Sequence, residues 1–308
     1  MVANPVSLYI FNRPQETARV LNVLREVKPS RLIVHADVPR AHAGKDADQC
    51  REVRALIDTV DWECEVTKNY SDSNLGSFAR IVSGLEFVFQ RFDRAIILED
   101  DCLPDTSFFP FCDELLDRYG RDTRISMIGG FSNLHRQDYP HSYFFSRYTM
   151  SWGWATWRRT WNLVDLGMSA WPETRVHGLD VAVPERWMRK EWIRKYDAIY
   201  EKKIKNGWDY QLQLCGWTNN MLAIIPKVNL IQNIGFGSAA THTQDSNSGN
   251  AQLRSSALEL PLRHPTDVVR DARADRLIER IHFERNVPRI IARQQVQAVL
   301  DFFKRLIP

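Results

Sequence analysis

The residues of this chain that could do chemistry start with three adjacent carboxylates, Glu99, Asp100 and Asp101. They follow four consecutive apolar residues, 95–98, and Pro104 ends the stretch. Such an apolar run predicts a strand buried on both faces, as in a parallel sheet. Adjacent acids repel one another unless a cation or hydrogen-bond donors hold them. Mg²⁺ and Mn²⁺ prefer such oxygen ligands and share them with substrate phosphates, so the run predicts a metal–diphosphate site.

An acidic turn at the start of a helix is the alternative interpretation of this run. In that case Asp105 or Thr106 would cap the helix that follows. This interpretation explains Asp105 well but leaves residues 99–101 unexplained. We therefore favour the metal–diphosphate site.

Two further charged residues come directly after predicted strands. Arg13 follows the strand 6–11 and precedes Pro14, which suits the first turn of a helix. In this turn Arg13 is placed to pair with a phosphate. Asp37 ends the strand 31–36, a position from which a carboxylate holds a base or ribose. Both residues could instead be plain surface charges.

Polar residues also open a long amphipathic helix that ends near Phe92. Its start, Asn74 to Ser77, could cap the helix and point backbone amides toward a ligand cleft. A simple N-cap without a ligand is the alternative. Asn74 is therefore a candidate binding residue.

The second half of the chain contains three more candidate features. Residues 151–161 include four tryptophans in eleven positions, which could pack a core or offer platforms for sugar rings. Asp209 lies between Trp208 and Tyr210, where it could act as a general base or cap a helix. A glycine-bearing loop, 234–243, carries His242 near its end.

Alternation of strands and helices up to residue 130 predicts an α/β fold with a mostly parallel, doubly wound sheet. Ligands of such sheets bind beyond the carboxyl ends of the strands, where the candidate residues above are expected. We expect one catalytic domain over residues 1–245, with a binding half 1–130 and an acceptor half 131–245. A linker and a helical extension would occupy residues 246–308.

The C-terminal extension carries an apolar stripe, Val296, Val299, Phe303 and Leu306, with basic residues nearby. Docking onto the catalytic domain is one interpretation of this stripe. Contact with a membrane surface or a partner is the other.

Composition limits the class of protein. A length of 308 residues allows one large α/β domain or two small ones, and a net charge of +3 is too small to indicate nucleic acid as a partner. The five cysteines are odd in number and form no Cys-x-x-Cys pair, which favours reduced thiols over a zinc site. No basic–apolar leader and no apolar run of roughly 20 residues is present, so we expect a cytoplasmic protein.

Taken in order, these elements resemble the GT-A glycosyltransferases, most closely the β-1,2-N-acetylglucosaminyltransferase I group and related bacterial sugar transferases. The resemblance covers about residues 5 to 245. The segment between Trp154 and Trp208 departs from the group, which leaves the acceptor open. The matching order is Asn12-Arg13, Asp37, the apolar strand into Glu99-Asp100-Asp101, Gly153-Trp154, Trp208-Asp209, Phe236-Gly237 and His242.

The resemblance implies a nucleotide-sugar donor, usually a UDP-sugar, with Mn²⁺ or Mg²⁺ on its diphosphate. It implies that Asp101 is the direct metal ligand, that Asp100 holds the ribose and that Glu99 faces the donor sugar. His242 is a metal ligand in many GT-A enzymes and is a second candidate here.

For the remaining residues the resemblance implies contacts of Arg13 with the diphosphate and of Asp37 with the uridine. Asn74 stays a donor-binding candidate because of its place at the helix start. Asp209 matches the catalytic base and implies inversion at the anomeric carbon. Trp154 and Trp208 are acceptor candidates.

The sequence therefore predicts a metal-dependent, inverting glycosyltransferase with a glycan, glycolipid or protein acceptor. The membrane contact of the C-terminal stripe would be peripheral, at the inner face. One alternative is a sugar-phosphate nucleotidyltransferase, although its usual glycine-rich, lysine-containing N-terminal loop is not matched by Asn12-Arg13-Pro14. Another is a non-catalytic carbohydrate-binding protein that uses the tryptophans.

Overall fold

The computed structural model describes residues 2–41, 44–134, 136, 138–202, 207–236 and 253–283. The chain divides into two compact units, Met1–Arg270 and Asp271–Pro308. In the second unit, the described residues form helix α9 (Ala272–Phe283). The predicted domain boundary after residue 245 and the apolar stripe 296–306 lie outside the described residues.

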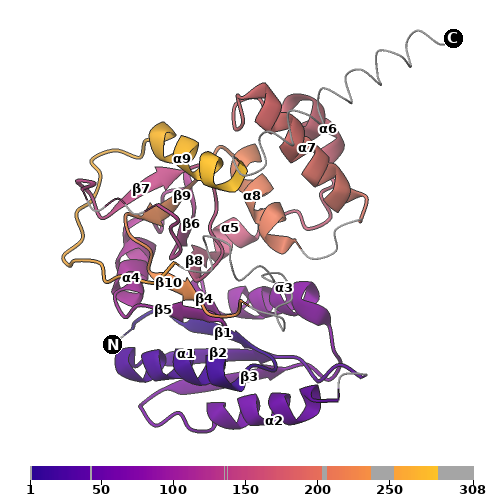
Figure 1. Ribbon diagram of the computed structural model, residues 1–308, viewed down its shortest axis with the longest axis vertical. Coiled ribbons are helices and arrows are strands. Elements are labelled where there is room, and N and C mark those ends of the chain that lie inside the picture. Colours follow the sequence, from indigo (N-terminus) through magenta and orange to yellow (C-terminus); the bar gives the residue numbers. More distant parts are fainter. Residues whose placement is uncertain are drawn as a thin grey trace, which may run out of the picture. The chain divides into compact units, whose positions relative to one another are not determined.

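An eight-stranded sheet forms the centre of the first unit, in the order β3-β2-β1-β4-β8-β6-β9-β7 (Figure 1). A second sheet pairs β5 (Cys102–Pro104) with β10 (Ile231–Asn233), antiparallel. The strands of the large sheet are β1 (Val6–Ile10), β2 (Arg31–Ala36), β3 (Glu65–Tyr70), β4 (Arg94–Glu99), β6 (Ile125–Gly129), β7 (Tyr143–Ser146), β8 (Trp154–Trp157) and β9 (Leu222–Pro226).

Most of the large sheet runs in one direction. Neighbours among β1 to β4 are parallel, and β6 is parallel to β9. β8 is antiparallel to both β4 and β6, so those two share a direction, and β7 is antiparallel to β9. The predicted α/β fold with a mostly parallel central sheet is therefore confirmed. In β4, residues 95–98 are each at most 2% exposed, as a strand buried on both faces requires.

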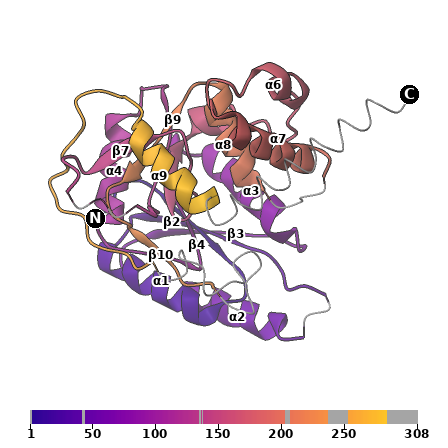
Figure 2. The ribbon, with the colours of Figure 1, turned by 45° about the horizontal axis from the view of Figure 1, so that its top comes forward.

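Helices cover both faces of this sheet. α1 (Pro14–Val27) and α2 (Asp46–Ile57) follow β1 and β2 and lie side by side (Figures 1 and 2). α3 (Gly76–Phe89) carries the chain from the edge strand β3 back to β4, opposite in direction to the steps from β1 to β2 and from β2 to β3. Because such crossovers are right-handed, α3 lies on the face of the sheet opposite to α1 and α2. The remaining helices of this unit are α4 (Phe108–Arg118), α5 (Arg158–Trp161), α6 (Trp171–His177), α7 (Arg186–Tyr200) and α8 (Trp208–Thr218).

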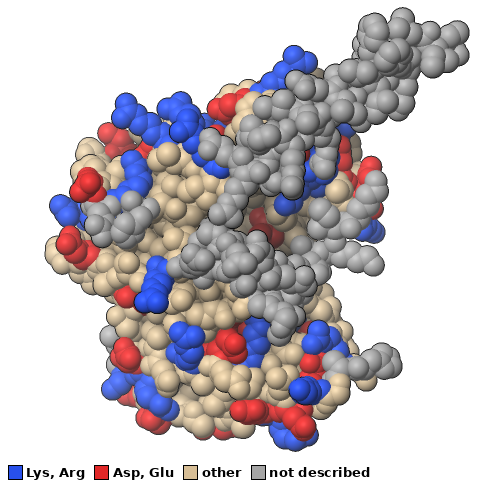
Figure 3. Space-filling model, viewed as in Figure 1, with Lys and Arg blue, Asp and Glu red and all other residues tan. Residues whose placement is uncertain are grey.

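The surface and the thiols agree with the composition. Basic and acidic side chains are interspersed over the face in Figure 3, and the net charge is +3. All five cysteines are free thiols. Within the described residues no helix has the length and apolar character needed to cross a membrane. The cytoplasmic location and the membrane contact of the C-terminal stripe stay predictions.

A buried polar network crosses the parallel half of the sheet at His35 of β2. Its Nε2 lies 3.0 Å from Ser7 Oγ, its Nδ1 lies 3.3 Å from Arg80 Nη2, and its ring stacks on Tyr9 at 4.5 Å. Burial, and then the charge of Arg80, lowers the pKa of His35 from 6.5 to about 3. Because arginine only donates, Nδ1 must accept, so Nε2 carries the proton and donates to Ser7.

The lowered pKa of His35 predicts a specific loss of stability in acid. Between pH 6.5 and about 3 the unfolded chain binds a proton at His35 that the folded chain does not, so the free energy of unfolding falls as pH falls. From pH 7 to pH 5 this contribution amounts to about 2 kcal/mol. We expect His35→Gln, which keeps a donor and an acceptor, to show a smaller loss over this range in urea unfolding. Equal pH dependence in the two proteins would contradict the neutral, buried imidazole.

Candidate functional site

A cavity of about 370 Å³ opens where β1, β2 and β4 end. Tyr9 of β1 is the register partner of Glu99 in β4, and β2 pairs with the other edge of β1, so the segments after all three strands meet at one edge of the sheet. Six of the residues predicted from the sequence line this cavity. They are Arg13, Asp37, Asn74, Glu99, Asp100 and Asp101.

At one end of the cavity, Arg13 holds two of the three carboxylates. Its Nη1 lies 3.3 Å from Asp100 Oδ1 and forms a second ion pair with Asp101 Oδ2. The backbone N–H of Phe11 donates to Asp100 Oδ2 at 3.0 Å. One guanidinium and one backbone amide thus supply the positive charge and the donor that adjacent acids need.

The electrostatics of this cluster favour additional positive charge. Burial, and then the charges of Asp101 and Asp100, raises the pKa of Glu99. Burial, and then the charge of Asp101, raises the pKa of Asp100. Both shifts arise because carboxylates lose hydration and repel one another. A cation beside them would lower this repulsion.

The residues present fit a Mg²⁺ or Mn²⁺ ion that is shared with a ligand, not one enclosed by protein. Among the described residues no three His, Cys, Asp or Glu side chains form a metal-binding group. Asp101 is only half-buried, and its Oδ1 has Cys102 Sγ, a weak donor, at 3.6 Å. Such ions are held by one or two carboxylates together with phosphates and water. His242 lies outside the described residues.

The start of the glycine-bearing loop passes directly over Asp101. Asn233 of β10 pairs with Cys102 of β5, and the backbone N–H of Ile234 donates to the Asp101 carbonyl at 2.8 Å. A Cβ atom on Gly235 would collide with the Asp101 carboxylate. Glycine at 235 is therefore what allows this close approach.

At the other end of the cavity, Asp37 joins β2 to the start of α3. Its Oδ2 accepts the backbone N–H groups of Leu75 and Gly76, both at 2.9 Å. Asn74 Nδ2 donates to the carbonyl of Val38 at 2.7 Å. These bonds fix the loop that forms this wall of the cavity. Asp37 is 5% exposed, and its Oδ1 has no hydrogen-bond partner among the described residues.

Arg80 is a cavity residue that the sequence analysis missed. It is 7% exposed, and its Nη2 bonds Asn69 Oδ1 as well as His35 Nδ1. Its Nε is buried and unpaired within the described part of the chain. The spacing in the sequence could have identified Arg80. Arg80, Gly84 and Val88 follow one another at intervals of four, so they lie on one face of α3, and that face is buried.

Asp209 lies in the first turn of α8 and is not its N-cap. The helix starts at Trp208, and the capping position belongs to Gly207. This finding removes the interpretation of Asp209 as the N-cap of this helix. Asp209 is half-buried, and its charge is one of those that raise the pKa of Glu99, so the two carboxylates interact electrostatically. Asp209 does not line the 370 Å³ cavity itself.

The two tryptophans considered for the acceptor pack against each other. Trp154 is 1% exposed, Trp208 is 8% exposed, and their rings stack at 5.4 Å. This burial matches the core interpretation of the tryptophan-rich segment, and their acceptor role stays a prediction that burial disfavours. Trp152 is more exposed, and it contacts Phe131 at 4.6 Å and Phe236 at 5.8 Å, beside the Gly235 segment.

No protein-family model matches the chain, and no curated protein matches its sequence. Among solved structures, the apo form of mouse xyloside xylosyltransferase 1 is 14% identical, with 69% of this chain and 80% of that chain covered and a TM-score of 0.35. The glycosyltransferase GlyE of Streptococcus pneumoniae is 11% identical, with 72% of this chain and 45% of its own covered and a TM-score of 0.35. HddC of Yersinia pseudotuberculosis, complexed with GMP-PN, is 10% identical, with coverages of 51% and 77% and a TM-score of 0.32. TM-scores this low do not establish a shared fold, so function is inferred from the site's own residues.

Proposed function

We propose that this protein is a GT-A type glycosyltransferase that moves a sugar from a nucleotide-diphosphate sugar to a glycan, glycolipid or protein acceptor. The observation that carries the proposal is the lining of the 370 Å³ cavity. At one end, the buried atoms Asp37 Oδ1 and Arg80 Nε have no hydrogen-bond partner among the described residues, so they are an acceptor and a donor that a ligand could pair. The other end holds three carboxylates with Arg13. A nucleotide diphosphate has complementary groups at its two ends.

The base end of this cavity suits uracil. Unpaired buried polar groups each cost roughly 1–3 kcal/mol, so a ligand that pairs both gains affinity. Uracil offers an N3–H donor for Asp37 Oδ1 and adjacent carbonyl oxygens for Arg80 Nε. Adenine and cytosine place a ring nitrogen acceptor where that N–H would be, and Asp37 would repel it. Guanine has the same pattern in its N1–H and O6, so the pattern favours a UDP-sugar or a GDP-sugar; with the resemblance noted in the sequence, we assign a UDP-sugar, such as UDP-N-acetylglucosamine, as the donor.

At the carboxylate end, we assign Arg13 to the diphosphate, Asp100 to the ribose and Glu99 to the donor sugar. Asp101 would hold Mn²⁺ or Mg²⁺, whose charge would stabilise the diphosphate as it leaves. Arg13 bridges Asp100 and Asp101, so its guanidinium is already at the end of the cavity where the diphosphate is proposed to bind.

On the acceptor side we assign Asp209 as the general base. It would take the proton of the acceptor hydroxyl while that oxygen bonds to the anomeric carbon. The bond from this carbon to the diphosphate oxygen breaks in the same step, so the configuration inverts. The half-buried position of Asp209 and its electrostatic interaction with Glu99 support this assignment.

Replacing Asp37 by asparagine should change which base is preferred. The asparagine oxygen can keep the bonds to Leu75 and Gly76, which places its amide nitrogen where Oδ1 faces the base. That nitrogen only donates, so it opposes uracil N3–H and suits cytosine N3. We expect the affinity for UDP to fall roughly tenfold or more, and the ratio of UDP affinity to CDP affinity to fall further. Calorimetry with UDP and CDP measures both.

The exposed Asp72 offers a matched control, because Asp72→Asn removes the same charge in the loop before α3. This variant should keep the preference of the wild-type protein for UDP over CDP. An unchanged UDP/CDP ratio in Asp37→Asn would contradict the base assignment.

A thermal-shift panel of nucleotide-sugars, with and without Mn²⁺, tests the proposed function as a whole. A ligand at ~100 times its dissociation constant should add roughly 2.7 kcal/mol of stability. Product analysis then identifies the reaction. A glycosyltransferase releases the nucleoside diphosphate from the donor. A nucleotidyltransferase instead uses pyrophosphate to form a nucleoside triphosphate and a sugar phosphate, and a binding protein forms neither product.

A further inference from the structure

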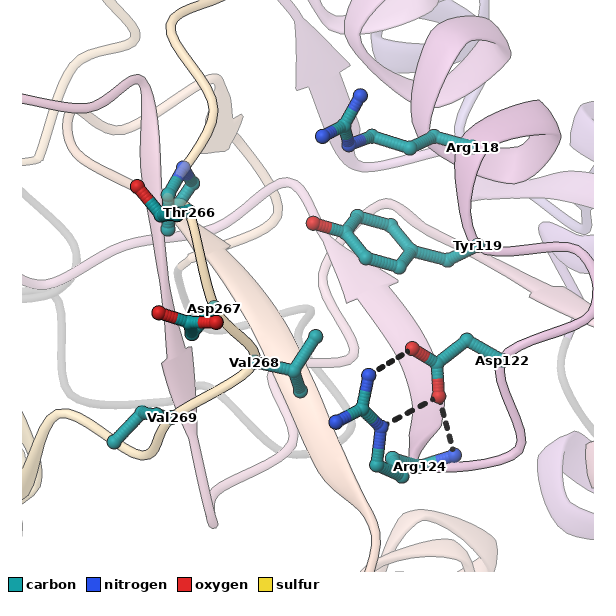
Figure 4. A pocket seen from close by; sticks show the side chains of 9 residues that line it. Arg118, Tyr119, Asp122, Arg124, Thr266, Asp267, Val268 and Val269 are labelled. Carbon is teal, nitrogen blue, oxygen red and sulfur yellow. Dashed lines mark hydrogen bonds and ion pairs between the residues drawn. The ribbon is translucent and has the colours of Figure 1, made fainter.

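A second cavity, of about 590 Å³, lies between the end of α4 with its turn into β6 and the segment 265–269 (Figure 4). Small-molecule sites span roughly 300–1,000 Å³, so its size fits a ligand. β6 runs parallel to β4, because β8 is antiparallel to both. The turn before β6 is therefore at the opposite end of the sheet from the carboxylates that follow β4. The two cavities share no lining residue.

Two arginines and two aspartates line this second cavity, and only one arginine and one aspartate form an ion pair with each other. Arg124 holds Asp122 through two bonds, Nε to Oδ1 at 2.9 Å and Nη2 to Oδ2 at 2.7 Å. Figure 4 shows this pair on one wall, with Arg118 above it and Asp267 on the opposite segment. Neither Arg118 nor Asp267 has an ion-pair partner in the part of the chain that the structure describes. Arg118 does interact with the Tyr119 and Tyr143 hydroxyls, which raise its pKa as hydrogen-bond partners. The Arg118 N–H groups that these hydroxyls do not use, and the Asp267 carboxylate, are available to a ligand.

A series of hydrogen bonds orients the hydroxyl of Tyr119, which lies between the two walls of the cavity. Tyr119 Oη lies 2.7 Å from Tyr143 Oη, which lies 3.0 Å from His264 Nδ1. His264 Nε2 lies 2.8 Å from Glu114 Oε1. When a neutral His264 donates Nε2–H to this carboxylate, Nδ1 accepts from Tyr143, and Tyr143 accepts from Tyr119. The proton of Tyr119 then points toward Tyr143, and its oxygen accepts from Arg118, which places that guanidinium at the cavity wall.

The combination of these groups selects a chemical class of ligand. Arg118 only donates, Asp267 only accepts, and the Thr266 hydroxyl does both. A simple anion would be repelled by Asp267 and a simple cation by Arg118, which leaves an uncharged polyhydroxyl ligand or a zwitterion. The apolar Val268 favours the first of these. A saccharide has no charge, and its neighbouring hydroxyls each donate and accept. Its C–H face can pack on Val268, which points into the cavity in Figure 4.

We infer that this cavity binds a neutral saccharide, at a site separate from the donor pocket. The inference goes beyond the proposed transferase function and does not depend on it. If both hold, the second site would anchor a distant part of a long glycan acceptor.

The test measures binding of maltotriose, galactotriose and chitotriose by calorimetry and by saturation-transfer NMR, in the presence of saturating UDP. At least one trisaccharide should bind the wild-type protein. Arg118→Ala and Asp267→Asn should each weaken that binding roughly tenfold or more, because each removes a charge-assisted hydrogen bond. Both side chains are exposed, so the variants should fold normally.

Arg121→Ala is the matched control, since Arg121 is exposed in the same turn but does not line the cavity. It should bind the trisaccharide as the wild type does. The same titrations without UDP, and the melting temperature of each variant, keep this result independent of the proposed function. Absence of trisaccharide binding, equal binding by all variants, or preferential binding of inorganic phosphate would overturn the inference.

Discussion

Replacing Asp209 by asparagine should abolish sugar transfer while leaving donor affinity nearly unchanged. Asparagine keeps the shape of the side chain and one oxygen, but it cannot take a proton at neutral pH. A general base contributes about 10²–10⁴-fold to a rate, so we expect a loss of ~10²-fold or more. A base that acts only in the chemical step affects turnover and not ground-state binding. Single-turnover transfer and UDP calorimetry measure the two quantities.

The position of Asp209 in α8 limits the effect of this substitution on helix capping. Gly207 is the N-cap of α8, so no side-chain cap is lost in the variant. The carboxylate does lie in the first turn, where a negative charge stabilises a helix by about 0.3–1 kcal/mol, so a small decrease in Tm is expected. A transfer rate near that of the wild type would leave the protein without its assigned base.

Asp101→Ala should remove the metal-dependent part of donor binding. A site that takes one or two carboxylates from the protein and the rest from diphosphate and water has few ligands to lose. Asp100 should not replace Asp101 as a metal ligand, because its two oxygens already accept from Phe11 N–H and from Arg13. Calorimetric titration of UDP with and without Mn²⁺ should show the enhancement by Mn²⁺ in the wild type and little or none in the variant.

UDP binding without metal provides the internal control. Removing Asp101 takes a negative charge away from the diphosphate and frees Arg13 from one ion pair, so metal-free affinity should stay the same or rise. A general loss of affinity with and without metal would indicate structural damage. An enhancement by Mn²⁺ equal to that of the wild type would show that Asp101 is not the ligand.

Several parts of this site are determined by the sequence alone, because they depend on local order along the chain. The apolar run 95–98 forms a strand buried on both faces, and the carboxylates that follow it must lie at its carboxyl end. Pro14 starts α1, so Arg13 falls in the turn after β1. In a parallel sheet these ends share one edge, which is why residues far apart in the chain could be grouped before the fold was known.

Only the tertiary structure decided which side chains are paired, buried or left free. Arg80 becomes a cavity residue because Asn69 and His35, on two different strands, hold its terminal nitrogen and leave Nε unpaired. Trp154 and Trp208 are separated by 53 residues and could not be recognised as a stacked, buried pair from their positions. Burial and pairing depend on contacts between distant segments, and local periodicity carries information only about the face on which a residue lies.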